Sequence, residues 1–344
     1  MIGRRLTGVV ALGAAAWALT SSLPDLPAPV TNNAVATGHA GTTHTIYSAL
    51  GVDASLRWSG ITTAAAVWTS TSPTWRSLPP VPGPHGRLAA TAQVVQGMLL
   101  VFGGYTVDSA AREVSLPDVN IYDPVRGAWQ LGTPTPVAVD DAVSGVYRDS
   151  LVYLVSGWHD TDNVQLVQVY DVVHDSWSAA TPIPGPGVFG HTGSLAGNTI
   201  VFVDGAVRQA TGPKYALAGQ TWIGTIDPHL PTAITWRAGP VHPGRPVYRA
   251  AAAACGRFVI IAGGTNNPYN YNGIGYDGTP SEPLRSVMAY DTRAGAWRTL
   301  APLPQATMDH RGLALMGDTA VVVAGLRSGQ RVTASTVTTS LGIC

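Results

Sequence analysis

A repeated pairing of tryptophan and glycine constrains this 344-residue chain more than any other feature. Five tryptophans are each followed, 28 or 29 residues later, by the glycine that ends an apolar segment, whereas the distance from one such glycine to the next tryptophan varies from 20 to 33 residues. The segment from tryptophan to glycine, which has a constant length, predicts a buried hairpin. The segment from glycine to the next tryptophan varies in length and predicts an exposed loop, because loops tolerate insertions. The glycines are Gly51, Gly104, Gly157, Gly205, Gly264 and Gly325, and the tryptophans are Trp75, Trp129, Trp177, Trp236 and Trp297.

An aromatic residue precedes most of these tryptophans by seven positions, and Asp follows it in Tyr122-Asp123, Tyr170-Asp171 and Tyr290-Asp291. A period near 50 residues with these features resembles the kelch repeat, over roughly residues 22–342. The resemblance implies an all-β fold, namely a six-bladed β-propeller of four-stranded antiparallel blades.

Six of these repeat glycines but only five of the repeat tryptophans occur, which leaves the last blade without its outer strand. We expect residues 22–27 to supply that strand by pairing with residues 332–341, so that the N-terminal strand closes the ring. The alternative is a ring of five blades with residues 45–51 outside it.

The N-terminal residues predict export. Arg4 and Arg5 precede an apolar run over residues 6–19, and Ala16-Trp17-Ala18 fits a cleavage site. We therefore expect a signal peptide over 1–18, one propeller domain over 19–344, and a secreted or periplasmic protein with no membrane span after cleavage. A retained N-terminal anchor is the alternative, and the export route, Sec or twin-arginine, stays open.

Charge and cysteine content limit the possible partners. The 20 basic and 20 acidic residues cancel, so the chain lacks the basic surface that nucleic-acid binding needs. Cys255 and Cys344 could form one disulfide in an oxidising compartment, or remain a buried and a loose thiol. The cysteine and histidine spacing predicts no metal site, and we expect no cofactor. The oligomeric state stays open.

The loops of one propeller face predict a ligand site. In antiparallel blades, the residues after each terminal glycine and those before each inner strand converge on the same end of the axis. Aromatic rings and polar groups together suit a small sugar, although a solvated loop rim is the alternative. The candidate ligand-binding residues are His85, Arg87, Tyr105, Asp141, Trp158, His159, Arg249, Asn267, Tyr269, Tyr271, Asp309 and Arg311.

Three of these candidates, Arg87, Arg249 and Arg311, are expected at equivalent positions in three blades. Because guanidinium groups bind carboxylates with two parallel hydrogen bonds, they suggest an acidic sugar. The alternative is that each arginine pairs with a nearby aspartate such as Asp141 or Asp309.

Among kelch proteins, the chain looks most like the secreted bacterial sialate epimerases, in residues 45–51, Trp75-Arg76-Ser77-Leu78, Arg87 and Arg311. That resemblance implies a mutarotase activity that interconverts the anomers of N-acetylneuraminate. The family's glutamate after the fourth terminal glycine is Ala206 here, and Ala206 cannot transfer a proton. Candidate acid–base residues are Asp160, His191, Asp204 and His310.

Two other functions compete with an epimerase. One is a non-catalytic module that binds carbohydrate or protein. The other is a copper oxidase of the galactose oxidase type, whose cofactor would require a tyrosine crosslinked to a cysteine.

Overall fold

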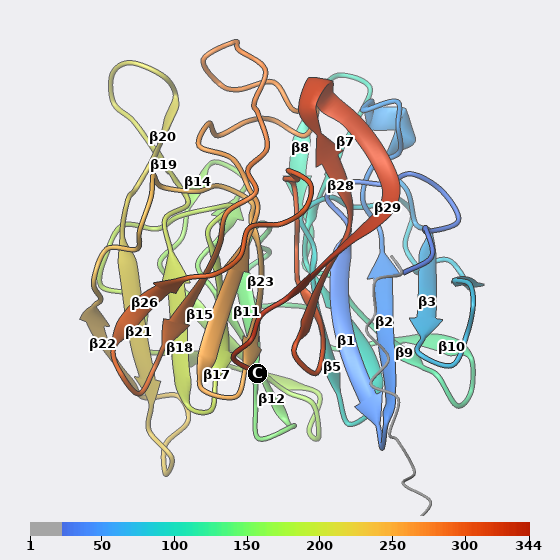
Figure 1. Cartoon of the computed structure of the whole chain (residues 1–344), viewed down its shortest axis with the longest axis horizontal. Coiled ribbons are helices and arrows are strands. Elements are labelled where there is room, and N and C mark those ends of the chain that lie inside the picture. The colour runs from blue at the N-terminus through green and yellow to red at the C-terminus, as the bar shows by residue number, and fades with distance from the viewer. Residues whose placement is uncertain (1–22) are drawn as a thin grey trace, which may run out of the picture.

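Six β-sheets surround a central axis in the computed structural model, which describes residues 23–344 (Figure 1). Each of the first five sheets has four antiparallel strands that follow one another from the axis outward. The predicted six-bladed propeller is confirmed, and residues 45–51 contribute to its first blade rather than lying outside the ring. From the axis outward, the blades are β1 (Ala34–Ala40), β2 (Thr43–Ala49), β3 (Ala65–Thr69), β4 (Arg76–Leu78); β5 (Thr91–Val95), β6 (Met98–Phe102), β9 (Val119–Asp123), β10 (Ala128–Leu131); β11 (Val143–Tyr147), β12 (Leu151–Val155), β15 (Val167–Asp171), β16 (Ser176–Ala180); β17 (Thr192–Ala196), β18 (Thr199–Val203), β21 (Thr221–Ile226), β22 (Ile234–Ala238); and β23 (Ala251–Cys255), β24 (Phe258–Ala262), β25 (Val287–Asp291), β26 (Ala296–Thr299).

Short additional elements lie in the loops between the second and third strands of the blades. These loops form the end of the propeller that we call the loop end. The opposite end, where the turns between the first and second strands of each blade lie, is the hairpin end. The elements are the two-stranded ribbons β7 (Tyr105–Val107) with β8 (Glu113–Ser115), β13 (Trp158–His159) with β14 (Asp162–Asn163), and β19 (Ala206–Arg208) with β20 (Tyr215–Leu217), and the 3-10 turns η1 (Trp58–Gly60) and η2 (Ser328–Gln330).

The sixth blade has three strands of its own, β27 (Ala314–Met316), β28 (Thr319–Arg327) and β29 (Arg331–Ser340). Residues 23–30 lie along β29 in the place of a fourth strand. The Leu26 N–H donates to the Ala334 carbonyl at 2.9 Å, and the Thr336 hydroxyl donates to the Leu23 carbonyl at 3.0 Å. The predicted closure by the N-terminal segment is therefore confirmed.

The outer-strand tryptophans join each blade to the one before it. Each indole N–H donates to the carbonyl at the exit of the preceding blade, and Trp75 makes the same bond to Pro24 at 2.9 Å. Residues 23–30 therefore serve as the outer strand of the sixth blade. The other four bonds run from Trp129 to Pro79, Trp177 to Thr133, Trp236 to Thr181 and Trp297 to Pro240.

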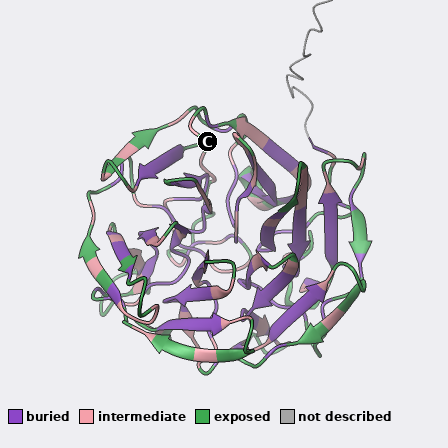
Figure 2. Cartoon of the chain, turned by 90° about the horizontal axis from the view of Figure 1, so that it is seen from below, coloured by how far each residue is buried: buried purple, intermediate pink, exposed green. Residues whose placement is uncertain are grey.

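The terminal glycines permit a close backbone approach. Gly157 has φ of +117°, and a Cβ at this position would lie 2.5 Å from the carbonyl oxygen of Asp140. Only glycine fits there, because the sheet end and the incoming inner strand share this space. Seen along the axis, the inner strands are buried and exposure concentrates on the outer ones (Figure 2).

A disulfide joins Cys255, at the end of β23, to Cys344, with 5.7 Å between their Cα atoms. The sequence left this pairing open. The expected signal peptide, residues 1–18, lies outside the described residues. Across residues 23–344, no helix has both the length and the apolar character needed to cross a membrane.

Candidate functional site

A circle of hydrogen bonds gathers the residues that precede the inner strands. These residues have positive φ, and each uses its backbone or side chain to contact its counterpart in the neighbouring blade. The Asp141 N–H donates to the Ala89 carbonyl at 3.0 Å, and the Arg249 N–H donates to the Gly190 carbonyl at 2.8 Å. This circle brings side chains from distant parts of the chain to one place on the axis, near the loop end. Its members are Asn32, Ala89, Asp141, Gly190, Arg249 and Asp309.

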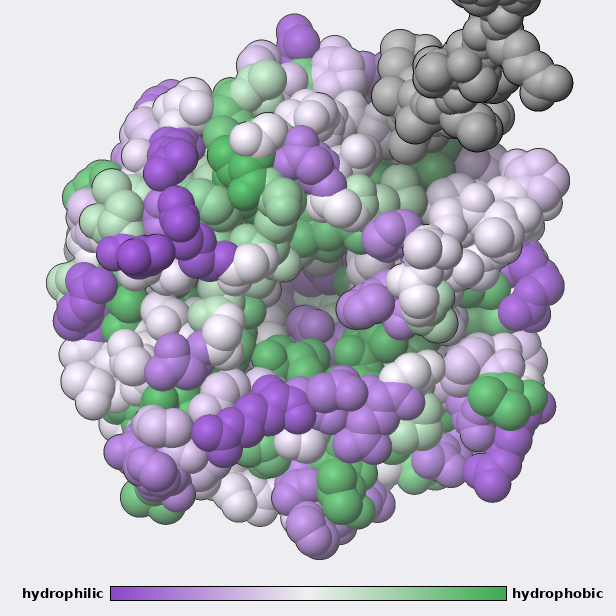
Figure 3. Space-filling view, turned by 60° about the horizontal axis from the view of Figure 1, so that its bottom comes forward, coloured by the Kyte–Doolittle hydropathy of each residue, from purple (hydrophilic) through white to green (hydrophobic). Residues whose placement is uncertain are grey.

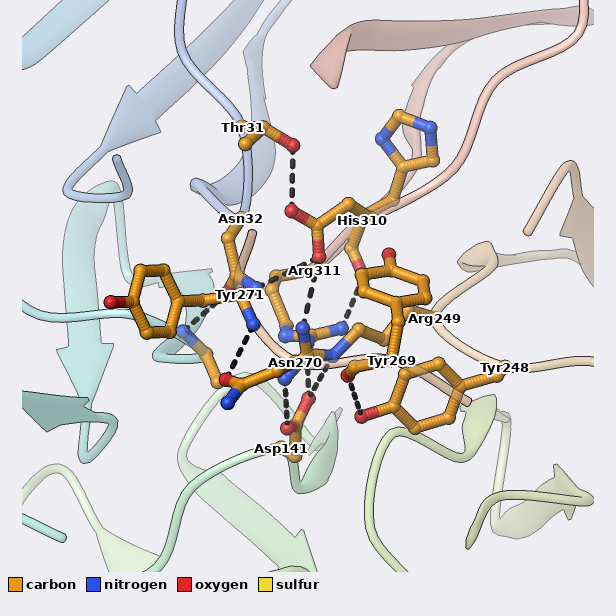
Figure 4. A network of polar contacts seen from close by, with 12 residues as sticks. Thr31, Asn32, Asp141, Tyr248, Arg249, Tyr269, Asn270, Tyr271, His310 and Arg311 are labelled. Atoms are coloured by element: carbon orange, nitrogen blue, oxygen red, sulfur yellow. Dashed lines mark hydrogen bonds and ion pairs between the residues drawn. The ribbon is translucent and has the colours of Figure 1, made fainter. Parts of the chain in front are cut away.

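Two arginines and two aspartates form a buried charge network at this place (Figure 4). Arg249 donates to both carboxylate oxygens of Asp141, at 3.2 and 2.7 Å, and to Asp309 at 3.2 Å. Arg311 forms an ion pair with Asp141. Burial favours the neutral form of Asp141, but Arg249 and Arg311 outweigh it and hold the pKa of Asp141 below its usual value. For Arg249 and Arg311, the alternative of arginine–aspartate pairing is confirmed.

Arg87 does not belong to this network, and the expected equivalence of the three arginines is wrong. In each of these blades, one residue forms a β-bridge with the residue after the terminal glycine, and this marks the equivalent position: Leu88, Tyr248 or Met308. Arg87 lies one residue before that position. Arg249 lies one residue after it, and Arg311 lies three residues after it. The sequence already indicates that the positions differ, because the next terminal glycine follows Arg87 by 17 residues, Arg249 by 15 and Arg311 by 14.

The Arg87 side chain points between the first two sheets instead. It bonds to Asn120 and lies 3.8 Å from the Asp118 carboxylate. Burial lowers the pKa of Arg87 to about 10, with Asp118 partly opposing the shift. Arg87 therefore supports the packing of the second blade.

Aromatic side chains fill the axis on the outer side of the network. Tyr248 and Tyr269 are fully buried, and the guanidinium carbon of Arg249 lies 5.0 and 5.2 Å from their ring centroids. Trp158 packs edge-on against Phe189, with 5.4 Å between the ring centroids. The predicted aromatic residues thus meet at the loop end, as expected, but there they cover the charges.

The remaining candidates of the loop end are not part of the charge network, and several bond to neighbouring loop segments. Ser115 links the carboxylates of Asp140 and Asp160, through its hydroxyl at 2.7 Å and its N–H at 3.1 Å. Burial and the neighbouring Asp141 raise the pKa of Asp140 well above its usual value. Elsewhere, His159 bonds to the Ala138 carbonyl, Asn267 bonds to Asp277 and Thr279, Tyr271 is half-buried, and His85 is exposed. Tyr105 is buried near the network: burial raises its pKa well above the usual value, and Arg249 partly opposes that shift.

Asp204 has a structural partner outside the network. One of its carboxylate oxygens accepts from His242 Nε2 at 2.7 Å and from the Val247 N–H at 2.8 Å. Burial acts to lower the pKa of His242, but the bond to Asp204 raises it above its usual value. The pair braces the connection between β22 and β23. Ala206 is fully buried opposite Phe189, so no acid or base stands at that position.

An axial channel of about 350 Å³ begins at the inner side of the network. Small residues of the inner strands, such as Ala36, Ala92 and Ala252, leave this space open between the blades. It extends to the hairpin end, where His39, Leu195 and Leu315 line it and where the surface is hollowed at its centre (Figure 3). Its polar wall consists of Thr37, Thr91, Gln93, Ser144, Thr192 and Ser194.

The inner end of the channel holds groups with unused hydrogen-bonding capacity. His191 lines the channel, its Nε2 bonds to the Val155 carbonyl at 2.9 Å, and its Nδ1 has no hydrogen-bond partner. Burial lowers the pKa of His191 to about 4, so the ring is neutral at pH 7 and Nδ1 is an acceptor. Arg311 Nε is likewise buried without a hydrogen-bond partner. His310 also lines the channel and bonds to Thr307 at 2.8 Å.

Sequence reasoning placed the site at the loop end and missed the channel. The run of small residues in an inner strand, clearest in Ala251–Cys255, is the signal that could have indicated it. Of the predicted residues, Asp141, His191, His310 and Arg311 line the channel, and the others do not.

The described residues offer neither a cluster of metal ligands nor the cysteine that a copper radical oxidase needs. Within residues 23–344, no three His, Cys, Asp or Glu side chains are placed to hold a metal ion together. Cys255 is in the disulfide, so it is not available for the tyrosine crosslink of a copper radical oxidase.

Known proteins resemble this chain in both sequence and fold. The kelch motif matches residues 246–304. Human Kelch-like protein 34 is 24% identical over 263 residues, which cover 74% of this chain and 36% of that protein, so the chain spans about a third of its length. Among solved structures, YjhT shares the fold with a TM-score of 0.74 and 17% identity, over 94% of this chain and 98% of that one. This chain contains the kelch motif and folds as a kelch β-propeller.

Proposed function

We propose that this protein is a secreted kelch propeller that binds a small neutral sugar in its axial channel, entered from the hairpin end. The observation that carries the proposal is a channel of about 350 Å³ whose wall is rich in hydroxyl groups and whose buried end offers unpaired acceptor and donor atoms. Channels of this volume fall in the range of small-molecule sites.

Charge balance favours a neutral ligand over an acidic one. The two positive charges of Arg249 and Arg311 face the two negative charges of Asp141 and Asp309. A carboxylate from an acidic sugar would add a third buried negative charge with no third positive charge to balance it, which costs several kcal/mol. A sugar hydroxyl can instead donate to His191 Nδ1 and accept from Arg311 Nε.

Secretion is part of the proposal because two observations support it. The N-terminal pattern is that of a signal peptide, and the Cys255–Cys344 disulfide is of the kind that persists in oxidising compartments.

Calorimetry tests this function. The mature protein is titrated with glucose, galactose, mannose, N-acetylglucosamine and N-acetylneuraminate. We expect at least one neutral sugar to bind, and N-acetylneuraminate to bind at least about tenfold more weakly. Ser194→Leu, which fills the channel, should abolish binding, while Trp58→Ala, at an exposed side chain of the loop end, should not change it. Absence of heat with every sugar would overturn the proposal.

Mutarotation in the same channel is the second candidate. His191 Nδ1 is a free acceptor near the Asp141 carboxylate and can take the proton of the anomeric hydroxyl. The bond between the anomeric carbon and the ring oxygen then breaks, and the ring oxygen takes that proton from the imidazolium. Reclosure on the other face of the carbonyl gives the other anomer and reverses the proton transfers. Exchange spectroscopy on the sugar that binds should then show faster anomer interconversion with the protein. His191→Gln, whose amide oxygen can still accept the sugar hydroxyl but cannot take its proton, should remove the acceleration while keeping most of the binding.

A further inference from the structure

A second cavity adjoins the axial channel at the hairpin end. This groove, of about 810 Å³, runs between the first and second blades from the channel mouth to the outer rim. Thr37, His39 and Val94 line both the channel and the groove, so the two spaces meet at these residues. Gly38 lies at this junction, and a Cβ there would come within 2.9 Å of the Val94 side chain.

The groove has the surface chemistry of a site for a neutral polyhydroxylated chain. Its wall carries the hydroxyl groups of Thr45, Thr69, Ser72 and Thr74. Tyr47, Val67 and Val94 provide apolar surface between them, which suits the C–H faces of sugar rings. One positive and one negative residue, Arg76 and Asp149, also line it, so it has no excess of either charge.

The position of the groove decides what kind of ligand fits both spaces. The channel is closed at its inner end by the charge network and the buried tyrosines, so a chain can enter only by one of its ends. A peptide entering this way would place a charged terminus against a network that is already balanced. The end of a neutral oligosaccharide brings only hydroxyl groups.

We infer that the ligand is a linear neutral oligosaccharide, held with its terminal sugar in the axial channel and its next units in the groove between the first two blades. This inference rests on the proposed sugar binding in the channel and extends it to a ligand class. The channel selects the terminal unit, and the groove adds affinity for the units that follow.

A pair of matched variants tests the groove. Thr74→Trp adds bulk at a residue that lines the groove. Ala128→Trp adds a similar bulk at the equivalent position of the second blade, directly before Trp129, and that residue is exposed but outside the groove. Thermal unfolding of both variants shows whether each is folded.

Calorimetry then compares glucose, mannose and N-acetylglucosamine with their linear oligomers up to the tetrasaccharide. We expect affinity to rise at least about tenfold from the monosaccharide to the trisaccharide in the wild type and in Ala128→Trp. Thr74→Trp should lose this rise and keep the affinity for the monosaccharide.

The outcomes separate the two proposals. If a monosaccharide binds but its oligomers bind no more tightly, or if the rise survives in Thr74→Trp, the groove inference is overturned and sugar binding in the channel stands. If neither monosaccharides nor oligomers bind, both proposals are overturned. If both tryptophan variants lose the rise equally, the effect does not belong to the groove, and the inference fails.

Discussion

The two ends of the propeller axis are built from the same strands but differ in what fills them. At the loop end, Arg249 and its carboxylate partners are buried beneath Tyr248 and Tyr269. At the hairpin end, small and hydroxylated residues such as Ala252 and Ser194 leave a channel. A propeller face rich in polar and aromatic residues can therefore be the closed face, because those residues satisfy one another's charges and hydrogen bonds.

The largest expected effect comes from removing the centre of the closed end. Arg249→Met keeps most of the side-chain volume but leaves Asp309 without its arginine partner and removes both hydrogen bonds from Arg249 to Asp141. Breaking a buried ion pair from one side typically costs about 3–5 kcal/mol, and we expect a loss of that size in the free energy of unfolding at pH 7. Urea unfolding measures it.

The control for this substitution is Arg237→Met, at an exposed position of β22. It should change the free energy of unfolding by less than about 0.5 kcal/mol. If Arg249→Met were equally mild, the network would not hold the closed end together.

Acid should weaken the closed end next. The folded-state pKa of His191 is about 4 because burial disfavours the imidazolium. In the unfolded chain the pKa is about 6.5, so between these values the unfolded state binds the extra proton and the free energy of unfolding falls as the pH falls. This histidine alone should cost about 3 kcal/mol by pH 4.

Urea midpoints measured at several values between pH 7 and pH 4 test this expectation. His191→Gln should lose stability less steeply than the wild type over that range. Parallel curves for the two proteins would contradict a buried, neutral His191.

The smallest expected effect lies at the open end. Cys344→Ser removes the disulfide to Cys255, and we expect a loss of about 2 kcal/mol, at the low end for a native disulfide. The loss is small because the Asp318 carboxylate still accepts from the backbone N–H groups of residues 342–344. Reduced wild type should match the variant in thermal unfolding. A loss as large as that of Arg249→Met would contradict the expectation that the closed end contributes more to the free energy of unfolding than the open end.

Most of the fold followed from the sequence because its signals are local and repeated. Each terminal glycine lies where a Cβ would meet backbone, as at Gly157, and each tryptophan bonds to the preceding blade, as Trp129 does to Pro79. The missing sixth tryptophan correctly predicted that residues near Pro24 complete the last blade.

The site followed only in part, because its contacts join distant residues. Arg249 and Asp141 are 108 positions apart. No pattern in the residues next to either one indicates that their charges neutralise each other rather than the charge of a ligand. Which end of the propeller axis is open depends on where the loop carrying Tyr269 packs. The spacing of residues in the sequence does not predict side-chain packing of this kind. The position of Asp141 near the axis was predictable; its role as a closed partner of Arg249 and Arg311 was not.

The seam between residues 23–30 and β29 also limits when the ring can close during synthesis. The Thr336 hydroxyl meets Leu23 across 313 positions of the chain. Ribosomes synthesise residues 23–30 long before β29. Until β29 exists, residues 23–30 have no strand to pair with, and Pro24, the acceptor of Trp75, is not held in place. Ring closure therefore cannot precede the synthesis of β29, the last strand that the structure describes.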